Sequence, residues 1–321
     1  MEFKLPSPEQ FKLGIRAVYS VAIADGPIGD GERAVLAAAA RVIGRPIGVD
    51  IDLDRLTPIT PAALAAAIDD PQIRYQLIGA MVVMTFADAD IDGPEVELVE
   101  AFARALDVKD GALTALRHLA EERLLLARLD TLRRFWGVKK IQQIAASEGL
   151  SYYWKAAMGA MRRQDDPTIA ARYRALEASP PGSLGRAYYD YMISNGFPFP
   201  GERGSAPEVI VFHDMTHILS GYKTTPDEEI LVAAFTGGYV SADPLHMFLF
   251  VLGQFQLGVP MAPGVPPEAG HLNAARMLIA VRRGAAMNLD LNDQWDYWSV
   301  IHEPLAALRE RYGIRPESDY D

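Results

Sequence analysis

The chain of 321 residues contains no cysteine. It therefore cannot form disulfides, cysteine-ligated zinc sites or a thiol nucleophile, and this composition is typical of a reducing compartment. Long uncharged hydrophobic segments without proline are also missing, so no transmembrane helix is predicted. The first six residues lack the apolar core of a signal peptide. We expect a cytoplasmic protein, with peripheral attachment to the inner face of a membrane left open.

Positive charge is scarce, with 31 Lys and Arg against 42 Asp and Glu and a net charge of −11. This balance argues against nucleic acid as a partner. Alternating strand patterns are scarce as well, which predicts an all-α fold. Half of the residues are hydrophobic and 23% are charged, as in a globular chain with a full core. The length favours two helical domains, which we place at residues 1–150 and 165–321.

Histidine is rare too, since the chain has six, yet two of them lie four residues apart as His213 and His217. Positions i and i+4 share one face of a helix, so the two imidazoles can bind one ion. Asp214 lies at the edge of the same face, where it is either a third ligand or the residue that orients a histidine. The alternative is a helix whose two histidines only hydrogen-bond to their neighbours.

A second helix is predicted directly after this motif. Gly221 fits the end of the first helix, Thr225 the N-cap of the next and Pro226 its first position. Glu228 fits the reciprocal position of a capping box, which leaves Glu229 free to join the histidines. Two histidines with one or two carboxylates suit Zn(II), Fe(II) or Mn(II).

The C-terminal half resembles a known family through these residues and their flanks. The matching segments are residues 181–188, residues 195–197, His213-Asp-Met-Thr-His217, Gly221-Tyr222, Glu229 and residues 303–314. In this order they are similar to the ubiquinone (coenzyme Q) biosynthesis family that is numbered fourth in the yeast series. The resemblance covers about half of the chain, and the spaced His/Asp/His/Glu set is its most specific part.

This resemblance implies a helical, lipid-handling protein with His213, Asp214, His217 and Glu229 around one divalent metal. It implies support of C1 decarboxylation and hydroxylation of a polyprenylated aromatic precursor, either as an enzyme or as a non-catalytic scaffold that organises quinone-biosynthesis enzymes. A metal-dependent phosphohydrolase is a further alternative, although such chemistry usually requires another upstream histidine. The family lacks the front half of this chain, so ubiquinone itself is not assured as the product.

The front half contains an internal repeat of helix, acidic turn and helix. The turn that begins at Asp25 aligns with the turn that begins at Asp88, and each has a glutamate seven residues later, Glu32 and Glu95. The repeat resembles the tellurite-resistance protein B-like (TerB-like) domain, whose acidic turns are suspected metal sites. An EF-hand loop is excluded because its twelfth position would be Val99. We expect an ion between each Asp/Glu pair, or acids that only cap helices.

Residues 128–163 contain eight basic residues, two acidic ones and several aromatic ones. Such a composition favours an anionic membrane surface, or else a solvated linker face or one docked on the acidic turns. Arg186 and Lys223 are weaker candidates for binding an anionic group of the substrate, and a helix-surface salt bridge is the alternative for Arg186. Homo-oligomerisation stays open.

An apolar stretch follows Glu229, with Asp243 as its one charged residue before Glu268. Its centre, residues 247–257, is too short to span a bilayer and predicts either a buried helix or the wall of a tunnel for a polyprenyl chain. Residues 260–267 hold four prolines and predict a loop at the mouth of that tunnel.

Overall fold

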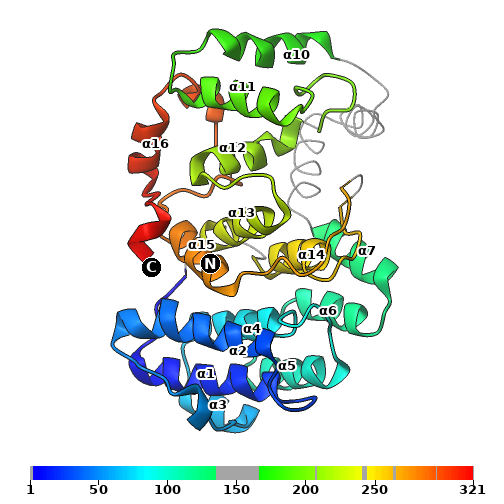
Figure 1. Ribbon diagram of the computed structural model, residues 1–321, viewed down its shortest axis with the longest axis vertical. Helices are drawn as coiled ribbons and strands as arrows, with labels where there is room; N and C mark the ends of the chain where they lie inside the picture. The colour runs from blue at the N-terminus through cyan, green and yellow to red at the C-terminus, as the bar shows by residue number, and fades with distance from the viewer. Residues whose placement is uncertain are drawn as a thin grey trace. The chain divides into compact units, whose positions relative to one another are not determined.

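The computed structural model describes residues 3–134, 166–206, 208–240, 244–262, 265–293 and 295–320. Within these ranges the chain is helical and has no β-strand, apart from two isolated bridges (Figure 1). The predicted all-α class is thereby confirmed. Among the same residues, no helix is long and apolar enough to cross a bilayer.

The chain divides into two compact units, and neither is one continuous stretch of sequence. The first unit contains Met1–Leu132, Thr225–Ala285 and Pro316–Asp321. The second unit contains Arg133–Thr224 and Ala286–Arg315. The predicted domains, 1–150 and 165–321, are drawn from sequence motifs and do not coincide with these packing units.

The front half of the chain supplies the first helices of the first unit. These are α1 (Pro8–Ala22), α2 (Asp30–Ala39), α3 (Pro61–Ala67), α4 (Pro71–Met84), α5 (Gly93–Ala105), α6 (Ala112–Ala120) and α7 (Leu124–Arg134). Shorter helical segments are the π-helix η1 (Ala40–Gly44) and the 3₁₀ helices η2 (Arg45–Ile47) and η3 (Leu53–Arg55). Helix α1 begins where it does because Ser7 and Gln10 form a capping box. Acidic turns join α1 to α2 and α4 to α5, so the structure contains the repeat expected from the sequence.

Later segments complete the first unit. They are α13 (Pro226–Tyr239), α14 (Pro244–Phe255), α15 (Ala274–Ala285) and η7 (Glu317–Tyr320). Helices α13 and α15 pack closely because glycines lie at their contact. A Cβ on Gly238 would lie 2.2 Å from the Val281 carbonyl oxygen, and one on Gly284 would lie 1.9 Å from that of Phe235. Helix α15 also packs on α2, and α14 packs on α6, which joins this segment to the N-terminal helices.

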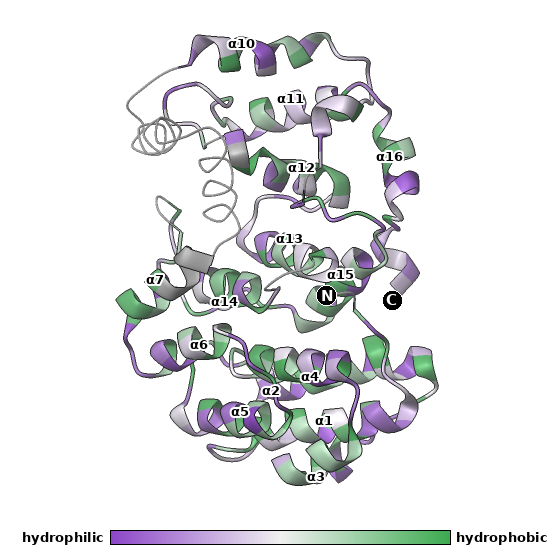
Figure 2. Cartoon of the chain, turned by 180° about the vertical axis from the view of Figure 1, so that it is seen from behind, coloured by the Kyte–Doolittle hydropathy of each residue, from purple (hydrophilic) through white to green (hydrophobic). Residues whose placement is uncertain are grey.

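Helix α14 is buried along most of its length, and Figure 2 colours much of it as hydrophobic. Gln254, at 0% exposure, fixes the loop after it. Its carboxamide makes hydrogen bonds of 2.8–3.1 Å with backbone groups of Met261, Ala262, Val265 and Pro266. Gln256 donates to the Phe86 carbonyl at 2.9 Å, so the end of α14 is also tied to the N-terminal helices. The described part of the predicted mouth loop is therefore held in place by a buried side chain.

The second unit is built from shorter helices around aromatic side chains. Its helices are α10 (Pro167–Arg174), η4 (Ala175–Ala178), α11 (Leu184–Asn195), η5 (Glu208–Ile210), α12 (Val211–Ser220), η6 (Tyr297–Val300) and α16 (Leu305–Tyr312). Tyr173 and Tyr188 are fully buried, with ring centroids 5.7 Å apart. The Tyr173 hydroxyl lies 2.6 Å from that of Tyr297 and donates to Glu208 at 2.8 Å. This core supports one side of α12.

Candidate metal centre

Helix α12 carries both histidines of the predicted motif. The Nε2 atoms of His213 and His217 lie 3.3 Å from each other. The two ring planes are nearly perpendicular, with an interplanar angle of 86°. The i, i+4 spacing thus brings two imidazole nitrogens toward one point, as a helix requires of residues one turn apart.

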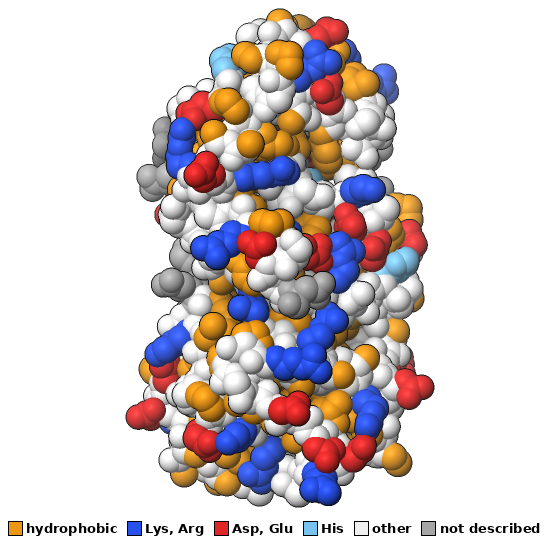
Figure 3. Space-filling model, turned by 60° about the vertical axis from the view of Figure 1, so that its left-hand side comes forward, with side chains coloured by type: hydrophobic (Ala, Val, Ile, Leu, Met, Phe, Trp, Pro, Cys, Tyr) orange, Lys and Arg blue, Asp and Glu red, His pale blue; other side chains and the backbone are white. Residues whose placement is uncertain are grey.

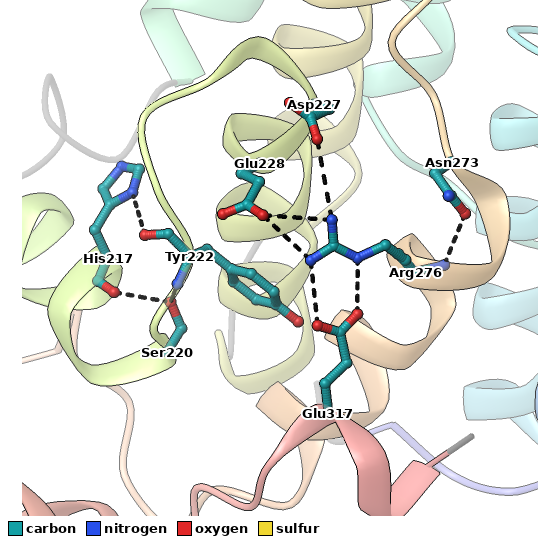
Figure 4. A network of polar contacts seen from close by, with 8 residues as sticks. All are labelled: His217, Ser220, Tyr222, Asp227, Glu228, Asn273, Arg276 and Glu317. Atoms are coloured by element: carbon teal, nitrogen blue, oxygen red, sulfur yellow. Dashed lines mark hydrogen bonds and ion pairs between the residues drawn. The ribbon is translucent and has the colours of Figure 1, made fainter.

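The connection after α12 holds the second nitrogen of His217. Its Nδ1 lies 3.2 Å from the backbone carbonyl oxygen of Tyr222, a contact drawn in Figure 4. A carbonyl oxygen can only accept, so Nδ1 is the protonated nitrogen and donates to it. In the neutral ring Nε2 then carries a lone pair directed at His213. Because His217 is 2% exposed, its surroundings fix this orientation.

The histidine pair fits a bound transition-metal ion. Zn–N bonds of about 2.0–2.1 Å at tetrahedral angles place two ligand nitrogens about 3.3–3.4 Å apart. The distance between the two Nε2 atoms, 3.3 Å, agrees with this value, and it equally fits a hydrogen bond between the two rings, the alternative expected from the sequence. Histidines that bind metals commonly donate their other ring N–H to a carbonyl oxygen, as His217 does. Two imidazoles suit zinc, and they also suit iron or manganese when carboxylates complete the shell.

Arg309 of α16 supports the C-terminal end of α12. Its Nε donates to the Leu219 carbonyl at 2.9 Å and its Nη2 to the Ile218 carbonyl at 2.8 Å. The helix ends at Gly221, whose φ of 84° is left-handed and favours glycine. The glycine is recognisable from the sequence, since helix ends have a local signature. The role of Arg309 is not, because its partner carbonyls lie about 90 residues earlier in the chain.

Asp214 is half-buried on α12, and its charge acts on Tyr188. Burial, followed by the negative charge of Asp214, raises the pKa of the Tyr188 hydroxyl above its ordinary value. Asp214 therefore lies near the aromatic core of the second unit. Its predicted role as a metal ligand or as a residue that orients a histidine stays a prediction.

Glu229 lies in the first turn of α13, in the first unit, and is half-buried. The predicted N-cap and first helical residue, Thr225 and Pro226, are confirmed. The Glu229 backbone N–H donates to the Thr225 carbonyl at 2.8 Å, as expected at a helix start. The role of its carboxylate as a metal ligand remains a prediction.

The neighbouring Glu228 has a different role from the one predicted. Thr225 makes no side-chain capping hydrogen bond, so the expected capping box is wrong. Glu228 instead accepts from Arg276 of α15 at 3.3 Å, and Arg276 also donates to Glu317 at 2.9 Å (Figure 4). A charged partner from another helix thus takes the place of the expected local cap. The two adjacent glutamates still have different roles, as the sequence suggests.

A second group of acids gathers in the first unit. Asp25, Glu32 and Glu95 offer carboxylate oxygens that all lie within 4.8 Å of one another, and Glu32 and Glu95 are buried. Burial, followed by the charges of Glu32 and Asp25, raises the pKa of Glu95 to about 8. Burial also raises the pKa of Glu32, although the Gly29 backbone N–H donates to it at 2.6 Å. The raised pKa of Glu95 favours a proton held within the cluster, and the ion expected from the sequence stays a prediction.

The acidic turns are arranged differently from the two Asp/Glu pairs that the sequence predicts. Asp25, Glu32 and Glu95 form one group, and Asp88 is not a member of it. Asp88 lies beside the group, since its negative charge helps to raise the pKa of Glu32, and it packs against the start of α2, where a Cβ on Gly31 would lie 2.2 Å from its Oδ1. Tertiary packing of the two turns therefore makes one cluster where the sequence indicates two sites.

The weaker candidates lie at the surface. Arg186 donates to Asp190 one turn along α11 at 3.0 Å, as in the expected helix-surface salt bridge, and Lys223 is exposed. The predicted membrane-binding stretch, 128–163, lies from residue 135 onward outside the described residues. On the face shown in Figure 3, lysines and arginines lie among acidic and hydrophobic side chains.

Comparison with known proteins finds little that is similar. No protein-family model matches the chain, and no curated protein matches it. A crystal structure of a Nostoc punctiforme PCC 73102 protein named for ubiquinone biosynthesis is similar at 17% sequence identity, over 73% of this chain and 95% of that one. Its TM-score of 0.32 is too low to assign a family or a function.

Proposed function

We propose that this chain is a metal-dependent protein of prenylated-quinone biosynthesis, with ubiquinone as the expected pathway. The observation that carries the proposal is the imidazole pair of α12, whose 3.3 Å Nε2–Nε2 distance fits two ligands of one ion. The pathway comes from the resemblance of residues 181–229 and 303–314 to the ubiquinone-biosynthesis family. The proposed substrate is a polyprenylated aromatic acid.

In this proposal His213, His217 and Glu229 bind the metal, with Asp214 as a fourth ligand or as the residue that orients a histidine. Two neutral imidazoles and one or two carboxylates are a donor set that zinc, iron and manganese accept. A metal bound there would supply Lewis-acid chemistry toward the ring oxygens or the carboxylate of the substrate. The Tyr222 carbonyl keeps the Nε2 lone pair of His217 available, and Arg309 holds the end of the helix that carries both rings.

The adjacent glutamates provide a matched test of the ligand set. Glu229→Gln is expected to weaken metal binding by at least about 100-fold, because an amide oxygen is a neutral and weaker ligand. Glu228→Gln removes the same charge from the same helical turn and weakens the contact with Arg276. Elemental analysis of both purified variants gives their metal content. Equal occupancy in both variants would reject Glu229 as a ligand.

A non-catalytic lipid-binding scaffold is the second candidate. It is favoured by the burial of His217, which is 2% exposed, since closed metal sites are usually structural. In that case the metal only fastens helices together.

Removal of the metal separates the two candidates. An enzyme without its metal is expected to keep its melting temperature and bound lipid and to stop releasing labelled carbon dioxide from a prenylated aromatic acid. A scaffold without its metal is expected to melt earlier, and its metal-loaded form releases no carbon dioxide. If elemental analysis finds no metal in the freshly purified protein, and added zinc, iron and manganese do not bind, both candidates fail.

A further inference from the structure

The first unit contains an apolar cavity of about 190 Å³ that is partly open to solvent. Its walls come from α1, α2 and α4 of the front half and from α13, α14 and α15 of the later segment. None of the lining residues is charged, and none is a histidine. The side chains that line it include Ile15, Val83, Leu245, Phe248 and Leu278. A ligand inside would therefore contact mainly hydrocarbon.

Three lining residues have polar side chains, and each uses a polar group elsewhere. The Tyr75 hydroxyl donates to Asp110 at 2.7 Å. The Gln76 carboxamide pairs with both backbone groups of Lys4, at 2.9 and 3.0 Å. The Gln10 carbonyl oxygen accepts from the Ser7 N–H at 2.8 Å. These interactions direct polar groups to protein partners, so the lining favours a ligand segment without a polar head group.

The volume indicates how much ligand the cavity can hold. An apolar cavity of about 150 Å³ in another protein stays free of water and binds benzene. A cavity of about 190 Å³ is somewhat larger and is suited to a short stretch of hydrocarbon. Charged or strongly polar molecules are disfavoured, because their burial without partners is costly.

We propose that this cavity binds the end of an uncharged hydrocarbon chain, and that the N-terminal helices form part of the binding wall. The sequence predicts residues 247–257 as either a buried helix or a tunnel wall. Phe248 of this range lines the cavity, and so does Leu245 earlier in the same helix. The new element is the participation of α1, α2 and α4. It assigns the front half a direct part in ligand binding, which does not depend on the metal or on its chemistry.

Two alanines of α2 provide a matched pair of variants. Ala39 lines the cavity, whereas Ala37 of the same helix is exposed and does not line it. Ala39→Phe places a ring in the cavity and is expected to weaken binding at least tenfold. Ala37→Phe adds the same ring at the surface and is expected to bind as the wild type does. Ala80→Leu on α4 fills the cavity with a smaller group and serves if Ala39→Phe fails to fold.

The probes are radiolabelled farnesol and 1-hexadecanol, measured by equilibrium dialysis with the full-length protein. We expect the wild type to bind one equivalent of at least one alcohol, and the preferred alcohol shows whether prenyl or acyl chains are favoured. Binding is expected to persist after the metal is removed, so a failed metal proposal leaves this result unchanged. If the wild type binds neither alcohol, or if a folded cavity-filling variant binds as tightly as the wild type, the proposal is overturned.

Discussion

Glu95 makes the stability of this protein depend on pH in an unusual direction. It is 6% exposed, and burial and neighbouring carboxylates raise its pKa from an ordinary 4.5 to about 8. The folded chain therefore holds this proton more tightly than the unfolded chain does. The resulting stabilisation is complete below about pH 4.5, declines as the pH rises toward 8, and is lost above that value.

The size of this stabilisation follows from the pKa of Glu95 in the unfolded and folded chain, 4.5 and about 8. Each tenfold difference in proton affinity corresponds to about 1.4 kcal/mol, so the full difference corresponds to at most about 5 kcal/mol. Glu32 and Glu95 titrate together, which spreads the effect over the pair, and we expect a decline of about 2–5 kcal/mol. Glu95→Gln keeps the shape of the side chain and cannot ionise. It should match the wild type at pH 4.5 and exceed its stability by about 2–5 kcal/mol at pH 8.5.

Urea unfolding followed by circular dichroism between pH 4.5 and 9 measures this difference. Glu97→Gln is the control, since Glu97 is exposed on the same helix. If the wild type and Glu95→Gln lose the same stability over this range, the shared-proton cluster is refuted.

Adding calcium, magnesium or manganese at pH 8.5 then tests the predicted ion site. An ion that binds Asp25, Glu32 and Glu95 should restore the wild type but not Glu95→Gln, and no restoration would reject the ion.

Three further changes test the metal helix and the packing of the first unit. His217→Ala should lose metal by elemental analysis while far-UV circular dichroism stays unchanged, and full metal occupancy would contradict the site. Arg309→Ala leaves two carbonyls of the last turn of α12 without this donor. The free energy of unfolding in urea should fall by about 1–3 kcal/mol. An unchanged urea midpoint would show that the contact is unimportant. Gly284→Ala places a Cβ 1.9 Å from the Phe235 carbonyl oxygen and should cost about 1–3 kcal/mol or more.

Local features of this protein were accessible from its sequence. The end of α12 at Gly221 and the start of α13 at Pro226 follow from the preferences of helix termini, which involve only nearby residues. The approach of His213 and His217 follows from the helical repeat for the same reason. The all-α class followed from the scarcity of strand patterns.

Long-range packing was not accessible in the same way. Gly238 and Gly284 look like weak points of two helices in the sequence, but they let α13 and α15 approach each other closely. Glu228 has the spacing of a capping box, yet Arg276 from another helix binds it instead. In each case the decisive partner is brought close by tertiary structure, and local spacing carries no information about it.

The two acidic turns show the same limit. Their alignment in the sequence suggests equivalent sites, one for each copy of the repeat. Packing of the copies brings Glu95 of the second turn to Asp25 and Glu32 of the first, while Asp88 contacts the start of α2. Repeated sequence therefore predicts repeated local structure, but the composition of a site formed between the copies depends on how they pack.

The packing of the first unit also changes how the two halves of the chain relate to function. By motifs alone, the front half is a separate domain added to a metal-binding half. In the structure α14 is buried against helices that include α6, α15 packs on α2, and Gln256 binds the Phe86 carbonyl. Removing the front half would expose this apolar surface and open the cavity. The front half is thus part of the fold that holds the later helices, and it contributes to the wall of the apolar cavity proposed to bind a hydrocarbon chain.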